Sequence, residues 1–134
     1  MSGRIFIIDD DAAAVIGMKA LLECEGYEVA TSASPLTAAF ELRRFDPDVI
    51  LLDLNMPGLG GERLLSLDRK RAFPSGSQII LYSGRERDEL AAIAEQTGVD
   101  GFHSKGDDLD AFLLRIRRWV RCGRARHDYL KRSA

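Results

Sequence analysis

The sequence predicts an α/β domain with a doubly wound, five-stranded parallel sheet, and two observations support this prediction. Five short apolar segments alternate with five helical segments along the chain, which is the pattern of parallel strands joined by right-handed helical crossovers. Residues 49–52 are four consecutive aliphatic residues, as expected for a strand that is buried on both faces of a parallel sheet.

The five strands are expected in short apolar or alternating segments that end at turn residues. They cover residues 4–8, 27–31, 49–52, 78–82 and 101–104. The first strand leads into three aspartates at 9–11, and the third leads into Asp53 shortly before Pro57-Gly58. The predicted strands are therefore apolar, whereas the residues that follow them are acidic or polar.

The five helices are expected where apolar residues recur at intervals of three and four. They lie between residues 11 and 26, 34 and 45, 60 and 71, 86 and 97, and 107 and 121. Ser34 is placed as an N-cap with Pro35 at the first helical position, and Gly26 and Gly98 are placed to end two of the helices. The last helix has the most continuous apolar face, so we expect it to pack along the sheet.

Length and composition indicate one globular domain. The chain has 134 residues, of which 46% are hydrophobic and 30% are charged, and such a chain can bury a core of its own. We expect the domain to cover residues 1–121. The polar and basic segment 122–134 is expected to be a loosely held tail or linker stub.

Charge and hydropathy argue against several classes of partner. The net charge of −2 gives no overall attraction to nucleic acid, and the basic C-terminal segment is interpreted as a solvated helix face. No apolar run reaches the roughly 18 residues of a membrane helix, and no secretory leader is recognisable. Cys24 and Cys122 lack metal or redox spacing, so we expect a cytoplasmic protein with buried or idle thiols.

Polar side chains follow four of the five predicted strands: Asp9 and Asp10, Asp53, Ser83, and Lys105. Because the carboxyl ends of parallel strands share one edge of the sheet, we expect these side chains to lie close together. Three neighbouring carboxylates repel one another unless a cation joins them, and Mg²⁺ binds such oxygens together with phosphate. The sequence therefore predicts a magnesium and phosphoryl site in which Asp53 is the nucleophile. Taken alone, Asp53 could instead only cap its strand before the turn.

Four separate motifs resemble the CheY-like receiver domain of two-component response regulators. They are Ile7–Asp11, Asp53–Gly58, Leu81–Gly84 and Lys105. The motifs occur in the family's order with fitting distances between them, and the resemblance runs from about residue 4 to residue 121. It implies a flavodoxin-like (βα)5 fold with the strand order 2-1-3-4-5.

The resemblance implies how the acidic residues would act. Asp53 matches the residue that accepts the phosphoryl group, and Asp10 matches a direct metal ligand. Asp9 matches an acid that acts on the metal through water, and Asn55 matches the residue that offers its backbone carbonyl to Mg²⁺.

The resemblance also implies a switch. Ser83 matches the hydroxyl that turns toward the phosphoryl group, Lys105 matches the lysine that pairs with this group, and Phe102 matches the aromatic residue whose rotamer follows. The implied reaction is transfer from a phosphohistidine of a histidine kinase or histidine phosphotransfer protein to Asp53, followed by slow hydrolysis. This chemistry is directed at the domain itself, so no separate enzyme activity is expected. The implied output is a shifted population at the face of the fourth helix, fifth strand and fifth helix, read by a downstream protein or an output domain outside this sequence.

Three features of the sequence depart from the family's pattern or add to it. Gly106 stands where proline usually follows the lysine, and because a cis bond to a non-proline residue costs about 2.5–4 kcal/mol, we expect a trans bond. Gly60-Gly61 stands where Asp-Gly is common. Arg85 is expected to be an exposed arginine, with contact to the phosphoryl group as the alternative hypothesis.

Two other functions are compatible with an α/β fold. A small aspartyl-phosphate phosphatase of the haloacid dehalogenase kind also places an aspartate nucleophile after a hydrophobic strand. Its chemistry requires an acidic residue two positions later, where this chain has Asn55, which cannot protonate a leaving group. A flavin-binding domain is disfavoured by the acidic edge, because flavin phosphate is anionic.

Overall fold

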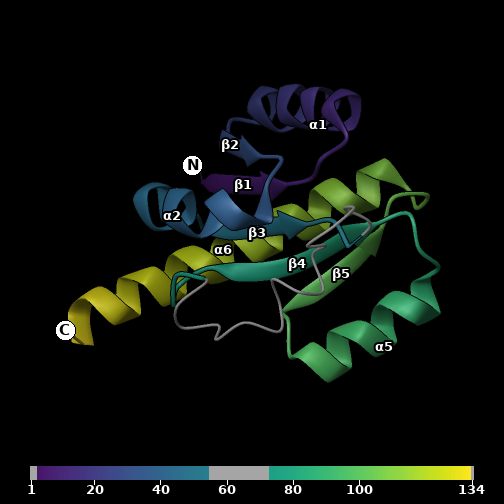
Figure 1. Ribbon diagram of the computed structural model, residues 1–134. Helices are drawn as coiled ribbons and strands as arrows, with labels where there is room; N and C mark the ends of the chain where they lie inside the picture. The colour runs from purple at the N-terminus through teal and green to yellow at the C-terminus, as the bar shows by residue number, and fades with distance from the viewer. Residues whose placement is uncertain (1–2, 55–72, 134) are drawn as a thin grey trace.

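Five parallel strands form one sheet in the computed structural model, which describes residues 3–54 and 73–133 (Figure 1). The strands are β1 (Arg4–Ile8), β2 (Glu28–Ser32), β3 (Val49–Leu52), β4 (Gln78–Ser83) and β5 (Gly101–Ser104). Their spatial order is β2-β1-β3-β4-β5, and each neighbouring pair is parallel. The predicted doubly wound fold and the strand order 2-1-3-4-5 are confirmed.

Helices cover both faces of this sheet. Within the described residues they are α1 (Ala12–Cys24), α2 (Pro35–Phe45), α5 (Arg87–Thr97) and α6 (Leu109–Ser133). Buried residues of α2 and α5 pack against one face, and buried residues of α1 and α6 pack against the other. The helix expected over 60–71, including Gly60-Gly61, lies outside the described residues.

Most helix ends follow the local signals in the sequence, although Ser34 at the N-cap position of α2 makes no side-chain cap hydrogen bond. Asp11 caps α1, because its carboxylate accepts a hydrogen bond of 3.2 Å from the backbone N–H of Ala14. Pro35 occupies the first turn of α2, and Asp46 ends that helix in the left-handed conformation at φ 48°. Gly98 ends α5 at φ 71°, where a residue without a Cβ is least strained.

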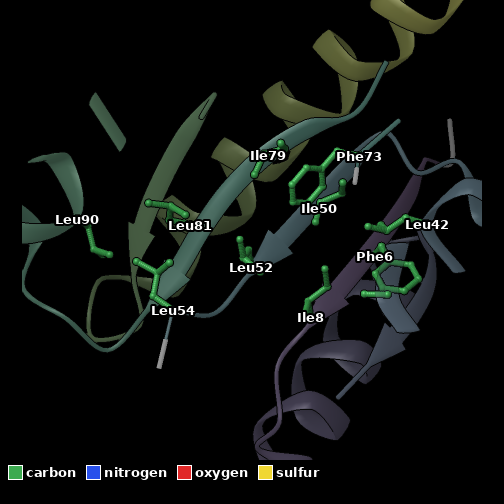
Figure 2. Packing of buried hydrophobic residues seen from close by; sticks show 11 residues of the cluster. Phe6, Ile8, Leu42, Ile50, Leu52, Leu54, Phe73, Ile79, Leu81 and Leu90 are labelled. Carbon is green, nitrogen blue, oxygen red and sulfur yellow. The ribbon is translucent and has the colours of Figure 1, made fainter. Parts of the chain in front are cut away.

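Each central strand contributes to a core on both of its faces. In β1, Phe6 and Ile8 point to the α2 and α5 side, whereas Ile5 and Ile7 point to the α1 and α6 side. Figure 2 shows the first of these two clusters, in which Ile8 and its neighbours on β3 and β4 form a continuous apolar layer. Burying one such aliphatic side chain contributes about 1.5–3 kcal/mol to stability, so both clusters hold the sheet in place.

The last helix continues far beyond its predicted end, so the expectation of a loosely held tail after residue 121 is wrong. α6 runs through Ser133 and passes the edge of the sheet at which β1 and β3 begin (Figure 1). Gly123 is buried there, and a Cβ at this position would collide with the backbone carbonyl oxygen of Asp48. Placement of a domain boundary at residue 121 stays a prediction.

His127 adds a polar contact to this extension of α6. Its Nδ1 lies at hydrogen-bond distance, 3.0 Å, from Oδ1 of Asp48. Its Nε2 lies 3.2 Å from Oδ1 of Asp46, which is within ion-pair distance, but this second contact lacks hydrogen-bond geometry. Asp48 is only 4% exposed, and its second oxygen accepts the backbone N–H of Arg4 at 2.8 Å. The extension is therefore anchored to the turn between α2 and β3.

Within the described ranges, no helix is long and apolar enough to cross a membrane. Cys24 and Cys122 are both exposed free thiols. Of the two expected alternatives, buried or idle, the first is wrong and the second stays a prediction.

Candidate functional site

The carboxyl ends of β1, β3, β4 and β5 bring five of the predicted site residues to one edge of the sheet: Asp9, Asp10, Asp53, Ser83 and Lys105. Backbone pairing continues one residue beyond the strands, because Asp9 N–H donates to Ser32 O at 3.1 Å and Asp53 N–H donates to Ile8 O at 3.0 Å. These bonds fix the backbones from which the two carboxylates project. Both side chains are largely buried, with Asp9 at 5% and Asp53 at 6% exposure.

Lys105 joins these two buried carboxylates. Its Nζ donates a hydrogen bond of 3.0 Å to Asp9 Oδ2 and one of 3.2 Å to Asp53 Oδ2. Burial lowers the pKa of the Lys105 ammonium, but the hydrogen bond to Asp9 and the charge of Asp53 outweigh burial, and the pKa is raised. The lysine is therefore held in its charged form between two acids.

Asp9 is fixed from two sides. Its Oδ2 accepts from Lys105, and its Oδ1 accepts the backbone N–H of Asp11 at 3.0 Å. Because Asp11 also caps α1, the entry of this helix and the orientation of the Asp9 carboxylate depend on each other. The run of three aspartates thus combines a local structural role with the site.

The described acidic residues at this edge match the chemistry of a magnesium site. One carboxylate oxygen each from Asp9, Asp10 and Asp53 lies within 4.8 Å of the other two. Counting only these three carboxylates and the Lys105 ammonium, negative charge is in excess, and all three carboxylates offer the hard oxygen ligands that Mg²⁺ prefers. Asn55, the fourth expected ligand, lies outside the described residues.

Ser83 and Phe102 lie on neighbouring strands and on the same side of the sheet. Ser83 is fully buried, and its backbone carbonyl accepts the Lys105 N–H at 2.7 Å. Phe102 is partly buried and packs against the α2 and α5 cluster, to which Leu81 also belongs. The two residues proposed as the switch are therefore connected through β4 and β5.

Gly106 follows Lys105 in a regular turn. The described part of the chain contains no cis peptide bond, so the expected trans bond between Lys105 and Gly106 is confirmed. The turn closes with a hydrogen bond of 3.0 Å from Asp107 N–H to Ser104 O.

Arg85 is more enclosed than expected. Its side chain is 25% exposed, and Nη1 lies 3.7 Å from Oε1 of Glu89 one helical turn later. This pairing directs at least one end of the guanidinium along α5. A contact with a phosphoryl group stays a hypothesis.

Two neighbours of the site were missed by sequence reasoning. Ser104 donates its hydroxyl to the backbone carbonyl of Arg85 at 3.0 Å. The Tyr82 ring lies 5.5 Å from Lys105 Nζ, and burial raises the pKa of the Tyr82 hydroxyl. Ser104 directly precedes Lys105 and Tyr82 directly precedes Ser83 in the sequence. This adjacency was the available sequence signal that the two residues lie near the site.

The parallel 2-1-3-4-5 sheet with three aspartates and a lysine at its carboxyl edge defines the class of response regulator receiver domains. A comparison with known families agrees with this class: the model of the response regulator receiver domain matches residues 5–117. Because this match covers most of the chain, the protein belongs to the receiver domain family.

Individual relatives are themselves response regulators. The chain is 35% identical over 116 residues to the nitrate/nitrite response regulator protein NarP of Escherichia coli (strain K12). This aligned region covers 85% of the chain and 53% of NarP. It is 32% identical over 117 residues to the transcriptional regulatory protein KdpE of Staphylococcus aureus. This second aligned region covers 87% of the chain and 49% of KdpE. The chain thus spans about half the length of these two relatives. The matches give no support to the phosphatase alternative.

A solved structure supports the same assignment. The CheY-like response regulator receiver domain protein of Methanospirillum hungatei JF-1 is similar at a TM-score of 0.79 and 26% identity, over 93% of this chain and 98% of that one.

Proposed function

We propose that this receiver domain is a phosphorylation switch in which Asp53 accepts a phosphoryl group from a phosphohistidine. The donor would be a histidine kinase or a histidine phosphotransfer protein. The observation that carries the proposal is the pairing of a buried carboxylate with a cation: Asp53 Oδ2 lies 3.2 Å from Lys105 Nζ, beside the oxygens of Asp9 and Asp10. A nucleophile and groups of both charges are thus already assembled.

In the proposed step, an oxygen of the Asp53 carboxylate attacks the phosphorus atom and a new O–P bond forms. The N–P bond breaks, and its electron pair stays on the imidazole nitrogen of the donor. Lys105 neutralises negative charge at the Asp53 side of the phosphoryl group, and the Ser83 hydroxyl donates to a phosphoryl oxygen. Water then hydrolyses the acyl phosphate slowly, which restores the carboxylate and releases phosphate.

Asp9, Asp10 and Asp53 would hold Mg²⁺, together with the backbone carbonyl expected from Asn55. When bound, the ion supplies positive charge next to the phosphoryl oxygens. Asp9 keeps its orientation through the Asp11 N–H, whereas Asp10 is exposed and so remains accessible.

The output would be read at the face formed by α5, β5 and α6, where Phe102 packs against the core and pairs in register with Leu81, two residues before Ser83. A downstream protein or an output domain is the proposed reader, because the region that matches this chain makes up only about half of each relative. Exposed free thiols at Cys24 and Cys122 agree with the proposed location in the reducing cytoplasm.

The proposal is tested by incubating the chain with acetyl phosphate and Mg²⁺ and measuring its intact mass. We expect one added phosphoryl group on the wild type and none on Asp53→Ala. Asp88→Ala is the matched control, because it removes an exposed aspartate from the first turn of α5 and should not affect labelling. An unlabelled wild type, or a labelled Asp53→Ala variant, contradicts the proposal.

A further inference from the structure

Two serine hydroxyls on neighbouring strands bind the backbone of the same residue. Ser83 on β4 and Ser104 on β5 are direct partners in the parallel register. The Arg85 N–H donates to Ser83 Oγ at 3.3 Å, and Ser104 Oγ donates to the Arg85 carbonyl oxygen at 3.0 Å. One residue of the loop between β4 and α5 is therefore held through both of its backbone polar groups.

Ser104 is itself well fixed. It is the last residue of β5, and its backbone carbonyl accepts the Asp107 N–H at 3.0 Å in the turn that contains Lys105. On the other side, Lys105 N–H donates to the Ser83 carbonyl at 2.7 Å. The Ser104 hydroxyl thus connects the loop after β4 to the hydrogen-bonded backbone that carries Lys105.

Rotation of the Ser83 hydroxyl toward a phosphoryl group would affect the two serine contacts with Arg85 differently. If the Ser83 hydroxyl rotates toward a phosphoryl group, its Oγ leaves the Arg85 N–H. The Ser104 contact with the Arg85 carbonyl does not involve Ser83 atoms, so it can persist in both rotamers. A loop that stays in place lets the hydroxyl rotate without displacing the Ser83 backbone.

We propose that Ser104 is a positioning residue that acts through Ser83: its hydroxyl holds the Arg85 backbone, and thereby keeps the Ser83 hydroxyl within reach of the phosphoryl group on Asp53. This inference rests on the proposed function. It assigns no contact between Ser104 and the phosphoryl group itself. Losing the Ser104 hydroxyl should therefore copy part of the effect of losing the Ser83 hydroxyl.

A double-mutant cycle on the full chain tests this inference. Each variant is labelled with acetyl phosphate and Mg²⁺, the donor is removed, and the half-life of the phosphoryl group is measured by intact mass. We expect Ser104→Ala to change the half-life by about threefold, in the same direction as Ser83→Ala and by a smaller factor. In the Ser83→Ala background, Ser104→Ala should change nothing further, because no hydroxyl is left to position.

A pair of isosteric variants separates positioning from folding. Ser104→Thr keeps a hydroxyl and should keep the wild-type half-life. Ser104→Val has the shape of the threonine variant but no hydroxyl, so it should behave like Ser104→Ala. Both residues are favourable in a strand, and thermal melting checks that each variant is folded.

Two results would overturn the inference while leaving the proposed function intact, because the wild type is still labelled on Asp53. These are a half-life in Ser104→Ala equal to that of the wild type, and an equal effect of Ser104→Ala in the wild-type and Ser83→Ala backgrounds. An unchanged half-life in Ser83→Ala would also overturn the inference, and with it the contact proposed between the Ser83 hydroxyl and a phosphoryl oxygen. An unlabelled wild type would instead contradict the proposed function and this inference with it.

Discussion

Lys105 Nζ lies 3.2 Å from Asp53 Oδ2 although 52 positions separate the two residues in the chain. The pair forms because β3 and β5 end at the same edge of a parallel sheet, with only β4 between them. The same ammonium also binds Asp9, so one cation balances two largely buried carboxylates. Much of the behaviour expected of this site follows from that charge balance.

Removing the Lys105 charge should make the site depend more strongly on a metal ion. In Lys105→Met, the carboxylates of Asp9 and Asp53 lose the ammonium that lies between them, and we expect the free energy of unfolding to fall by about 1–3 kcal/mol without metal. Mg²⁺ should then stabilise the variant more than it stabilises the wild type, because the metal no longer competes with an ammonium. Urea unfolding with EDTA and with Mg²⁺ measures both effects.

Lys19→Met is the control for this experiment, since it removes the same charge from α1. Its response to Mg²⁺ should equal that of the wild type. Equal stabilisation of Lys105→Met and the wild type by Mg²⁺ would show that the lysine and the metal do not share the acidic site.

Because Gly123 lies close to the Asp48 backbone, we expect its replacement by alanine to lower the stability of the fold, opposite to the usual effect in a helix. Alanine normally favours a helix, but at position 123 its Cβ would meet the Asp48 carbonyl, and we expect Gly123→Ala to destabilise the fold by about 1–3 kcal/mol. Gly17→Ala makes the same change in α1, where a Cβ meets no atom within 4 Å, and should stabilise by about 0.5–1 kcal/mol. Chemical denaturation of both variants provides the measurement. A stabilising Gly123→Ala would mean that α6 does not pack against this turn.

His103 should make stability depend on pH. Its ring is 2% exposed and packs against Tyr82 and Phe112, and burial together with the nearby Arg115 charge lowers its pKa from 6.5. The Arg115 guanidinium lies 3.4 Å from Nδ1, and because a guanidinium can only donate, this nitrogen is an acceptor and the ring is neutral.

The direction of this pH dependence follows from the number of protons bound by the folded and unfolded chains. Below about pH 6.5 the unfolded chain protonates His103 while the folded chain does not, so the free energy of unfolding should fall as pH drops through this range toward the lowered pKa. His103→Phe keeps the aromatic packing and should weaken this dependence. Urea unfolding at about pH 7.5 and about pH 5 tests the prediction. An equally steep pH dependence in His103→Phe would assign it to other groups.

The sequence was sufficient for the sheet and for the convergence of the acidic residues. Apolar segments such as 49–52 predict buried strands, and parallel strands necessarily bring Asp9, Asp53 and Lys105 to one edge. The α6 extension was not predictable in this way, because its polar residues follow the pattern of a solvated segment. Gly123, which disfavours a helix by itself, gains its role only from the approach to Asp48.

Ser104 escaped prediction for a related reason. Its hydroxyl binds a backbone carbonyl, and a carbonyl is present at every residue, so the sequence carries no complementary signal for this contact. The register that places Ser104 opposite Ser83 is known only once the strands are paired.

Locating the phosphoryl group within the labelled chain tests the central claim most directly. After labelling with acetyl phosphate and Mg²⁺, reduction with borohydride converts an aspartyl phosphate into homoserine, which tandem mass spectrometry can assign to one position. We expect homoserine at position 53, and no conversion in Asp53→Asn or when EDTA replaces Mg²⁺. Conversion at another aspartate, or none in the wild type, would contradict the account of Asp53 as the phosphoryl acceptor.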